Sequence, residues 1–122
     1  MQYYVTKCEL EIMNVLWCAG APLSRSGILE QSKEKSWKDN SIHILLNGML
    51  KKGLIKETGF IRSGKVWARL YSPALTVEEY YIDQMSAGRL PSFAVIIQAL
   101  YTSGKLSTMD LASIQEVLDG LR

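Results

Sequence analysis

The sequence predicts a mainly α-helical fold with one small β-hairpin and a helical arm. Capping signals and apolar residues at helical spacing predict three helices before Gly53. Two runs rich in β-branched and aromatic residues then flank Ser63-Gly64, which predicts a two-stranded hairpin. After Pro73 the helical spacing returns. A chain of 122 residues accommodates one such domain with an appended arm.

The first predicted helix begins at a capping box formed by Thr6 and Glu9. Its expected buried stripe consists of Leu10, Met13, Leu16 and Trp17. The helix ends at Gly20-Ala21-Pro22, and Leu23 supplies a short extended link. Ser24 then caps a second helix, which reaches about Ser32.

The third predicted helix follows a turn at residues 37–39 and has the most regular pattern. Its apolar residues fall at i, i+3, i+4, i+7 and i+8, which predicts one stripe facing the core. These residues are Ile42, Leu45, Leu46, Met49 and Leu50. Gly53 is the expected stop, and the two lysines before it suit the negative end of the helix dipole.

The hairpin is predicted over residues 54–60 and 66–71, with Arg62 and Lys65 at its tip. Pro73 closes this unit. Three helices and a hairpin with short links are the order of a winged helix-turn-helix domain. We therefore expect a DNA-binding domain of this type over residues 1–74.

Residues 75–122 are expected to form a helical dimerisation arm. Capping boxes at Thr76 and Ser107, with Leu90-Pro91 between them, mark three helices. Because these helices are too short and apolar for a separate core, we expect them to pack against a second copy of the chain. Folding back on the winged domain as a monomer is the alternative. The expected interface residues are Tyr80, Tyr81, Phe93, Ile96, Ile97, Leu100, Leu111, Ile114, Val117 and Leu118.

The charge is segregated along the chain. The net charge is only +2, which by itself indicates no polyanionic partner. Residues 23–69, however, contain ten basic and four acidic side chains, a net charge of +6, whereas residues 76–122 carry −3. A basic middle segment favours nucleic-acid binding, although charged side chains that merely face solvent are the alternative.

The sequence argues against several other classes of protein. Cys8 and Cys18 would lie about 15 Å apart on one helix, too far to form a disulfide or share a metal ion. The single histidine, His43, lacks the partners of a zinc or catalytic site. No apolar run approaches a membrane span, and Glu9 and Glu11 interrupt any secretory signal. We expect a cytoplasmic protein without metal, cofactor, membrane insertion or enzymatic activity.

Three parts of the sequence together have a recognisable pattern. They are Leu10-Glu11-Ile12-Met13-Asn14-Val15-Leu16-Trp17, Leu45-Leu46-Asn47 with Lys51-Lys52-Gly53-Leu54-Ile55, and Tyr71-Ser72-Pro73 with Glu78-Glu79-Tyr80. This pattern resembles the penicillinase and methicillin-resistance repressor family of bacterial winged-helix regulators, well over residues 7–85 and loosely in the arm. The resemblance implies a dimeric repressor that binds palindromic operators. It also implies release of repression when a membrane sensor protease triggers cleavage in the arm.

The sequence departs from this family pattern in three places. His43 and Gly48 stand where the family commonly has arginine, so the resemblance does not imply an operator sequence. Ala99-Leu100 stands loosely where the antibiotic-resistance members have a scissile Asn-Phe bond, which argues against the sensor protease as a partner. No cysteine follows Cys18, whereas the copper-responsive members end in a Cys-x-Cys motif, which excludes copper sensing by that route.

The outward face of the third helix is the expected reading surface for a double-stranded DNA operator. The core stripe leaves Asn40, Ser41, His43, Ile44 and Asn47 on this face. Asparagine can bond adenine and isoleucine can meet a thymine methyl group, although Ile44 could instead complete a wide core stripe. The side chains expected to hold phosphates are Lys38, Lys51, Lys52, Arg62 and Lys65. A homodimer would need a pseudo-palindromic operator. A winged-helix module that binds an acidic protein is the alternative function.

Overall fold

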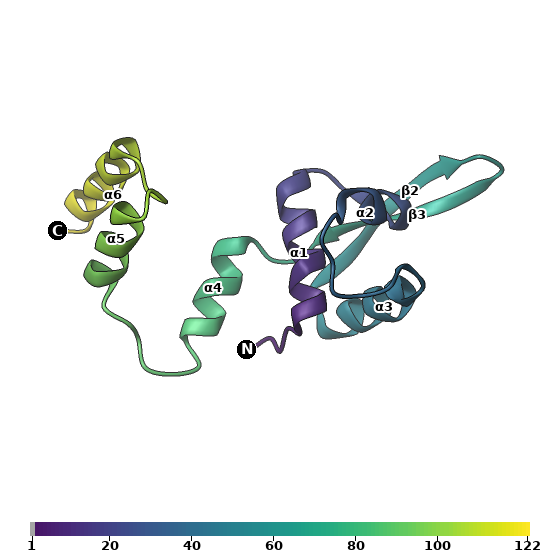
Figure 1. Ribbon diagram of the computed structural model, residues 1–122, viewed down its shortest axis with the longest axis horizontal. Helices are drawn as coiled ribbons and strands as arrows, with labels where there is room; N and C mark the ends of the chain where they lie inside the picture. Colours follow the sequence, from purple (N-terminus) through teal and green to yellow (C-terminus); the bar gives the residue numbers. More distant parts are fainter. Residues whose placement is uncertain (1) are drawn as a thin grey trace. The chain divides into compact units, whose positions relative to one another are not determined.

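The computed structural model describes residues 2–122, which form two compact units (Figure 1). The first unit ends at Gly88 and the second covers Arg89–Arg122. The first contains α1 (Lys7–Ala19), β1 (Leu23–Ser24), α2 (Arg25–Gln31), the 3-10 turn η1 (Asp39–Ser41), α3 (Ile42–Lys52), β2 (Ile55–Ser63), β3 (Val66–Pro73) and α4 (Val77–Met85). The second contains α5 (Phe93–Thr102) and α6 (Thr108–Leu121). Within residues 2–122, no helix has both the length and the apolar character that crossing a membrane requires.

The first unit is a winged helix-turn-helix domain, which confirms the predicted fold class. Three helices precede the β2–β3 hairpin, and β1 adds a third strand in the order β1-β3-β2. Leu23 pairs with Tyr71 and Ser24 with Leu70, both antiparallel. The short extended link expected at Leu23 therefore joins the sheet and ties the start of α2 to the hairpin.

The helices begin and end where local signals predict. Thr6 accepts a hydrogen bond from the Glu9 amide at 3.2 Å, and the Glu9 carboxylate accepts one from the Thr6 amide at 2.9 Å. The same reciprocal capping box opens α4 at Thr76 and α6 at Ser107. Gly53 ends α3 with a φ of 76°, a left-handed conformation that glycine adopts without strain.

The core of the first unit lies where the helices meet the base of the hairpin. Its fully buried side chains are Ile12, Met13, Leu16, Ile28, Met49 and Leu54. The α3 stripe is largely as expected, because Ile42, Leu46 and Met49 are buried while Leu45 and Leu50 pack against the core from its edge. In α1, Ile12 is more deeply buried than the expected Leu10 and Trp17.

The hairpin is longer than predicted and extends away from the helices (Figure 1). Its strands run to Ser63 and Pro73, with a bulge between Glu57 and Gly59. The bulge bends and twists the strands, which adds to their normal right-handed twist. At the tip Gly64 has a φ of 65°, as the tight turn requires. We refer to the hairpin as the wing.

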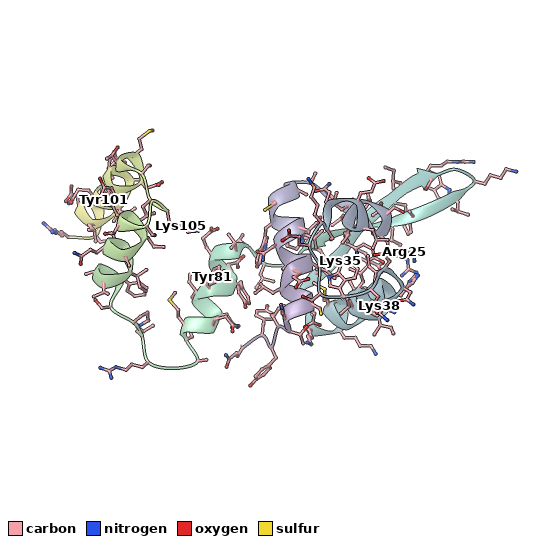
Figure 2. The ribbon with its side chains drawn as sticks, viewed as in Figure 1. Arg25, Lys35, Lys38, Tyr81, Tyr101 and Lys105 are labelled. Atoms are coloured by element: carbon pink, nitrogen blue, oxygen red, sulfur yellow. The ribbon has the colours of Figure 1, made fainter. Side chains whose placement is uncertain are left out.

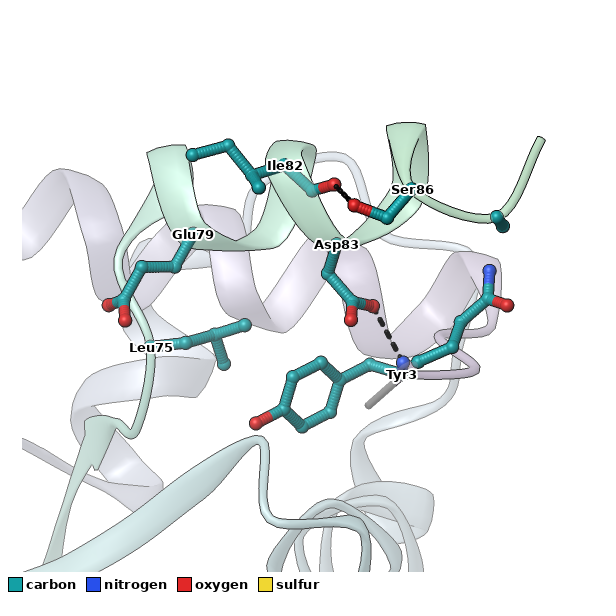
Figure 3. A pocket seen from close by; sticks show the side chains of 8 residues that line it. Tyr3, Leu75, Glu79, Ile82, Asp83 and Ser86 are labelled. Atoms are coloured by element: carbon teal, nitrogen blue, oxygen red, sulfur yellow. Dashed lines mark hydrogen bonds between the residues drawn. The ribbon is translucent and has the colours of Figure 1, made fainter. Parts of the chain in front are cut away.

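Helix α4 belongs to the first unit and is attached to its N-terminal segment. The Tyr3 amide donates to the Asp83 carboxylate at 2.7 Å, beside a pocket that Leu75 and Ile82 also line (Figure 3). Tyr80 is buried, with its ring centroid 5.7 Å from that of Trp17. The structure thus differs from the expectation that Tyr80 lies at a dimer interface, because this side chain packs within its own chain.

The second unit is a pair of helices without a core of its own. No residue of α5 or α6 is buried. Ile96, Ile97, Leu111 and Ile114 are half-buried, whereas Val117 stays 62% exposed. Ser92 and Ser107 cap the two helices. Local signals therefore define the helices, and their apolar side chains remain largely uncovered.

Candidate nucleic-acid interface

Helix α3 has two faces of opposite character. Ile42, Leu46 and Met49 are at most 2% exposed and hold the helix on the core. Ile44 is 76% exposed and lies on the outward face near His43 and Asn47, which are exposed as well. The outward position of Ile44 decides between the two readings of the sequence, because this side chain takes no part in the core.

The segment before α3 is anchored to α1. The Glu11 carboxylate accepts hydrogen bonds from the Ser36 amide at 2.7 Å and from the Ser36 hydroxyl at 2.6 Å. These bonds hold the pKa of Glu11 below its usual value. Trp37 is buried directly after this contact, and η1 follows with exposed Asn40. The anchor defines where α3 begins and therefore how its outward face is presented.

The two lysines at the end of α3 have different surroundings. Lys51 is exposed. Lys52 donates to the Glu9 carboxylate at 2.6 Å and to the Tyr4 carbonyl at 2.9 Å. The Glu9 side chain is only 6% exposed, so the Lys52 ammonium balances a buried charge. The sequence suggested both lysines for phosphate binding, but in the structure the Lys52 ammonium is bonded within the domain.

Arg25 is a candidate that the sequence analysis missed. It begins α2, and its guanidinium contacts both ring nitrogens of His43, with Nδ1 at 3.0 Å. Arg25, His43 and Asn47 line one hollow, together with residues of the wing. Arg25 lies at the same end of the first unit as Lys38 (Figure 2). The signal in the sequence was an arginine directly after the Ser24 cap, inside the basic segment.

The wing carries the remaining predicted basic residues. The Arg62 guanidinium donates from Nε to the Gly64 carbonyl at 3.2 Å and lies 5.7 Å from the centre of the Trp67 ring. Lys65 is exposed at the tip. Both cations therefore remain accessible to an anionic partner. Among residues 2–122 there is no cluster of three or more side chains able to hold a metal ion, and Cys8 and Cys18 are free thiols.

Comparison with known proteins identifies the family. The model of the penicillinase repressor family matches residues 5–120. This chain belongs to the penicillinase repressor family. Among solved structures, a mutant of ZitR from Lactococcus lactis is similar at 16% sequence identity and a TM-score of 0.45, over 97% of this chain and 73% of that chain. No curated protein sequence matches the chain.

The members of the penicillinase repressor family are transcriptional repressors, and the surface around α3 is suited to contact with DNA. Exposed amide and imidazole groups offer hydrogen bonds to base edges, and one isoleucine offers an apolar contact. Cations lie before α3, in its last turn and at the wing tip: they are Lys38, Lys51, Arg62 and Lys65. Cations in these places suit phosphates that position a duplex.

Proposed function

We propose that this protein is a dimeric repressor that binds a pseudo-palindromic operator with α3 in the major groove. The observation that carries the proposal is the exposure of Ile44, 76%, on a helix whose opposite face is buried. A large apolar side chain between exposed polar ones suits the floor of the major groove, where thymine methyl groups alternate with hydrogen-bonding groups. Asn40, Ser41, His43 and Asn47 are the proposed polar readers.

The proposed phosphate contacts surround this reading surface. We assign them to Lys38, Lys51, Arg62 and Lys65, and we add Arg25 because of its contact with His43. Lys52 is left out of the set, because its ammonium is bonded to Glu9 and to the Tyr4 carbonyl. These contacts position the domain on the duplex, whereas α3 supplies the sequence preference.

The proposed dimer forms through the C-terminal arm, within residues 75–122. Val95 and Val117 are each 62% exposed, and Leu121 is 78% exposed. Burying such side chains against a second copy removes apolar surface from water, at about 25 cal/mol for each Å². The proposed interface residues are Tyr81, Phe93, Ile96, Ile97, Leu100, Leu111, Ile114, Val117 and Leu118. Two copies related by a two-fold axis read two half-sites of opposite orientation.

Selection of bound duplexes from a random library tests the proposal. We expect the selected sites to be pseudo-palindromic, with half-sites one or more helical turns apart. The logarithm of the binding constant should fall linearly with the logarithm of the salt concentration. Absence of duplex binding at low salt would exclude the proposal. It would favour the alternative that the basic face binds an acidic protein.

A further inference from the structure

Large apolar side chains are exposed along the wing, where no core requires them. Phe60 is 62% exposed, Ile61 50%, Val66 66% and Trp67 63%. They flank the tip, which contains Arg62 and Lys65. Scattered exposed apolar residues need no explanation, but a cluster on one projecting hairpin indicates a contact surface. The function proposed above uses only the charged residues of this wing.

The strand register shows which of these side chains lie together. Phe60 is opposite Arg69 and Arg62 is opposite Trp67, so all four side chains share one face of the hairpin. Phe60 and Trp67 are diagonal neighbours and line an apolar recess between them. Arg62 lies over the Trp67 ring. We call Phe60, Arg62, Trp67 and Arg69 the aromatic wing face.

The charge of the wing indicates what kind of partner fits this face. Residues 58–73 contain Arg62, Lys65 and Arg69 and no acidic residue. The nearest carboxylate, Glu57, is bound to Arg69 at 3.0 Å. A partner must therefore combine negative charge with apolar surface. The sugar–phosphate backbone of DNA has both, because each phosphate is followed by a deoxyribose whose carbon atoms form an apolar surface.

The wing borders the surface around α3, and residues from both of its faces line the hollow between them. Trp67 and Arg69 line the same hollow as Arg25, His43 and Asn47. The major groove is bordered on each side by a sugar–phosphate backbone, so a duplex that receives α3 presents one of these backbones to the wing. The hollow therefore connects the residues proposed to read bases with those on the wing.

We propose that the aromatic wing face binds the DNA backbone that borders the groove read by α3, with Trp67 and Phe60 packed on deoxyribose. This inference rests on the proposed function. Arg62 neutralises a neighbouring phosphate, and the two aromatic rings supply an apolar contact that does not depend on salt. The wing thereby adds affinity for duplex DNA without reading its sequence.

Equilibrium binding to a mixed-sequence duplex of several helical turns separates these contributions. We expect Trp67→Ala and Phe60→Ala each to weaken binding at least about fivefold, with the salt slope unchanged. Arg62→Ala should lower that slope by about 0.9, the value for one phosphate contact. Tyr4→Ala is the matched control, since Tyr4 is an aromatic residue that is 76% exposed outside the wing. Equal affinities of the Trp67, Phe60 and Tyr4 variants would overturn the inference.

Tryptophan fluorescence of the full chain provides an independent readout. Trp67 is exposed, whereas Trp37 is buried and Trp17 half-buried, so acrylamide should quench mainly Trp67 in the free protein. Saturating duplex should protect this fluorescence, and Trp67→Phe should abolish the protected fraction.

The outcomes separate this inference from the proposed function. Persistent quenching in a wild-type complex, or protection by rising protein concentration without DNA, would overturn the wing inference alone. The second result would show that the face contacts another copy of the chain. A wild-type protein that binds no duplex would overturn both proposals.

Discussion

The Lys52 ammonium at the end of α3 lies 2.6 Å from the Glu9 carboxylate at the start of α1. Glu9 also completes the capping box with Thr6, so one carboxylate joins the first turn of α1 to the last turn of α3. Removal of Lys52 leaves a buried negative charge without its cation, which is costly. This ion pair therefore stabilises the orientation of α3 on the domain.

We expect Lys52→Met to lower the free energy of unfolding by about 1–2 kcal/mol, because methionine retains the apolar stem but not the charge. The side chain of Lys52 is 37% exposed, which keeps the loss moderate. Chemical denaturation monitored by circular dichroism measures the change. Lys51→Met is the control, with an expected change within about 0.5 kcal/mol. Equal losses in the two variants would contradict the assignment.

The pKa of the Glu9 carboxyl predicts how the stability of the domain depends on pH. Burial raises its pKa, but hydrogen bonds from Lys52 and Thr6 outweigh burial, so the pKa lies below the ordinary value of 4.5. A group whose pKa is lower in the folded chain stabilises it fully above the unfolded-state pKa. That contribution is lost as the pH falls through the folded-state pKa.

We therefore expect the free energy of unfolding to decrease as the pH falls from about 5.5 to about 3. Glu9→Gln should show a smaller decrease over this range, since its amide does not titrate. Part of the decrease should remain, because hydrogen bonds donated by Ser36 and Ser107 also lower the pKa values of Glu11 and Asp110. Urea titrations at a series of pH values measure the free energy of unfolding of both proteins. Parallel curves for wild type and variant would refute the role of Glu9.

Alanine substitutions of Ile44 and Leu46 should have opposite effects on stability and duplex binding, although the two residues lie only two positions apart on α3. Ile44 is 76% exposed, so Ile44→Ala should change the free energy of unfolding by no more than about 0.5 kcal/mol. It should weaken duplex binding at least about fivefold. Leu46 is 2% exposed, and Leu46→Ala should cost about 2–5 kcal/mol of stability. Thermal unfolding and duplex titration on both variants provide the comparison. Unchanged affinity of a folded Ile44→Ala protein would remove Ile44 from the reading surface.

The contact of Arg25 with His43 predicts a phosphate contact that the sequence did not suggest. Arg25→Ala should weaken duplex binding and lower the salt slope by about 0.9. Arg25→Lys should restore the slope, because lysine supplies the same charge. Arg89→Ala removes an exposed arginine outside the winged domain and is the control. An Arg25→Ala slope equal to that of this control would exclude the contact.

The exposed apolar residues of α6 predict the effect of a single charge on assembly. The Val117 side chain is 62% exposed in the single chain and is proposed to be buried between two copies. Val117→Asp would place a carboxylate in that interface, where burial of an unpaired charge is costly. We expect the mass measured by light scattering to fall from a dimer to a monomer at micromolar concentration. Ala112→Asp adds the same charge at an exposed position at least about 100° around the helix from each proposed interface residue of α6, and it should leave the mass unchanged. A dimer that persists in the Val117 variant would contradict the proposed interface.

Local structure follows from the sequence because its causes are local. A hydroxyl and a carboxylate three residues apart define the starts of α1, α4 and α6. A glycine that tolerates positive φ ends α3, and apolar residues at helical spacing predict its buried face. The winged helix-turn-helix order follows from these signals. Each signal depends only on residues that lie within about two helical turns of one another.

Contacts between distant residues were decided by tertiary packing. Lys51 and Lys52 are identical and adjacent, yet only Lys52 meets Glu9, which is 43 residues away in the sequence. Arg25 and His43 are 18 residues apart, and Tyr80 reaches the core beside Trp17 from a helix that the sequence assigned to the arm. No local pattern specifies these pairs.

The sequence by itself therefore determined the helices, the hairpin, the basic segment and the family resemblance. The tertiary structure decided that Ile44 points outward, that Lys52 is engaged internally and that Arg25 joins the surface around α3. The physical reason is that periodicity and capping act within a few residues of chain. Exposure and ion pairing depend instead on how α1, α2 and α3 pack around one core.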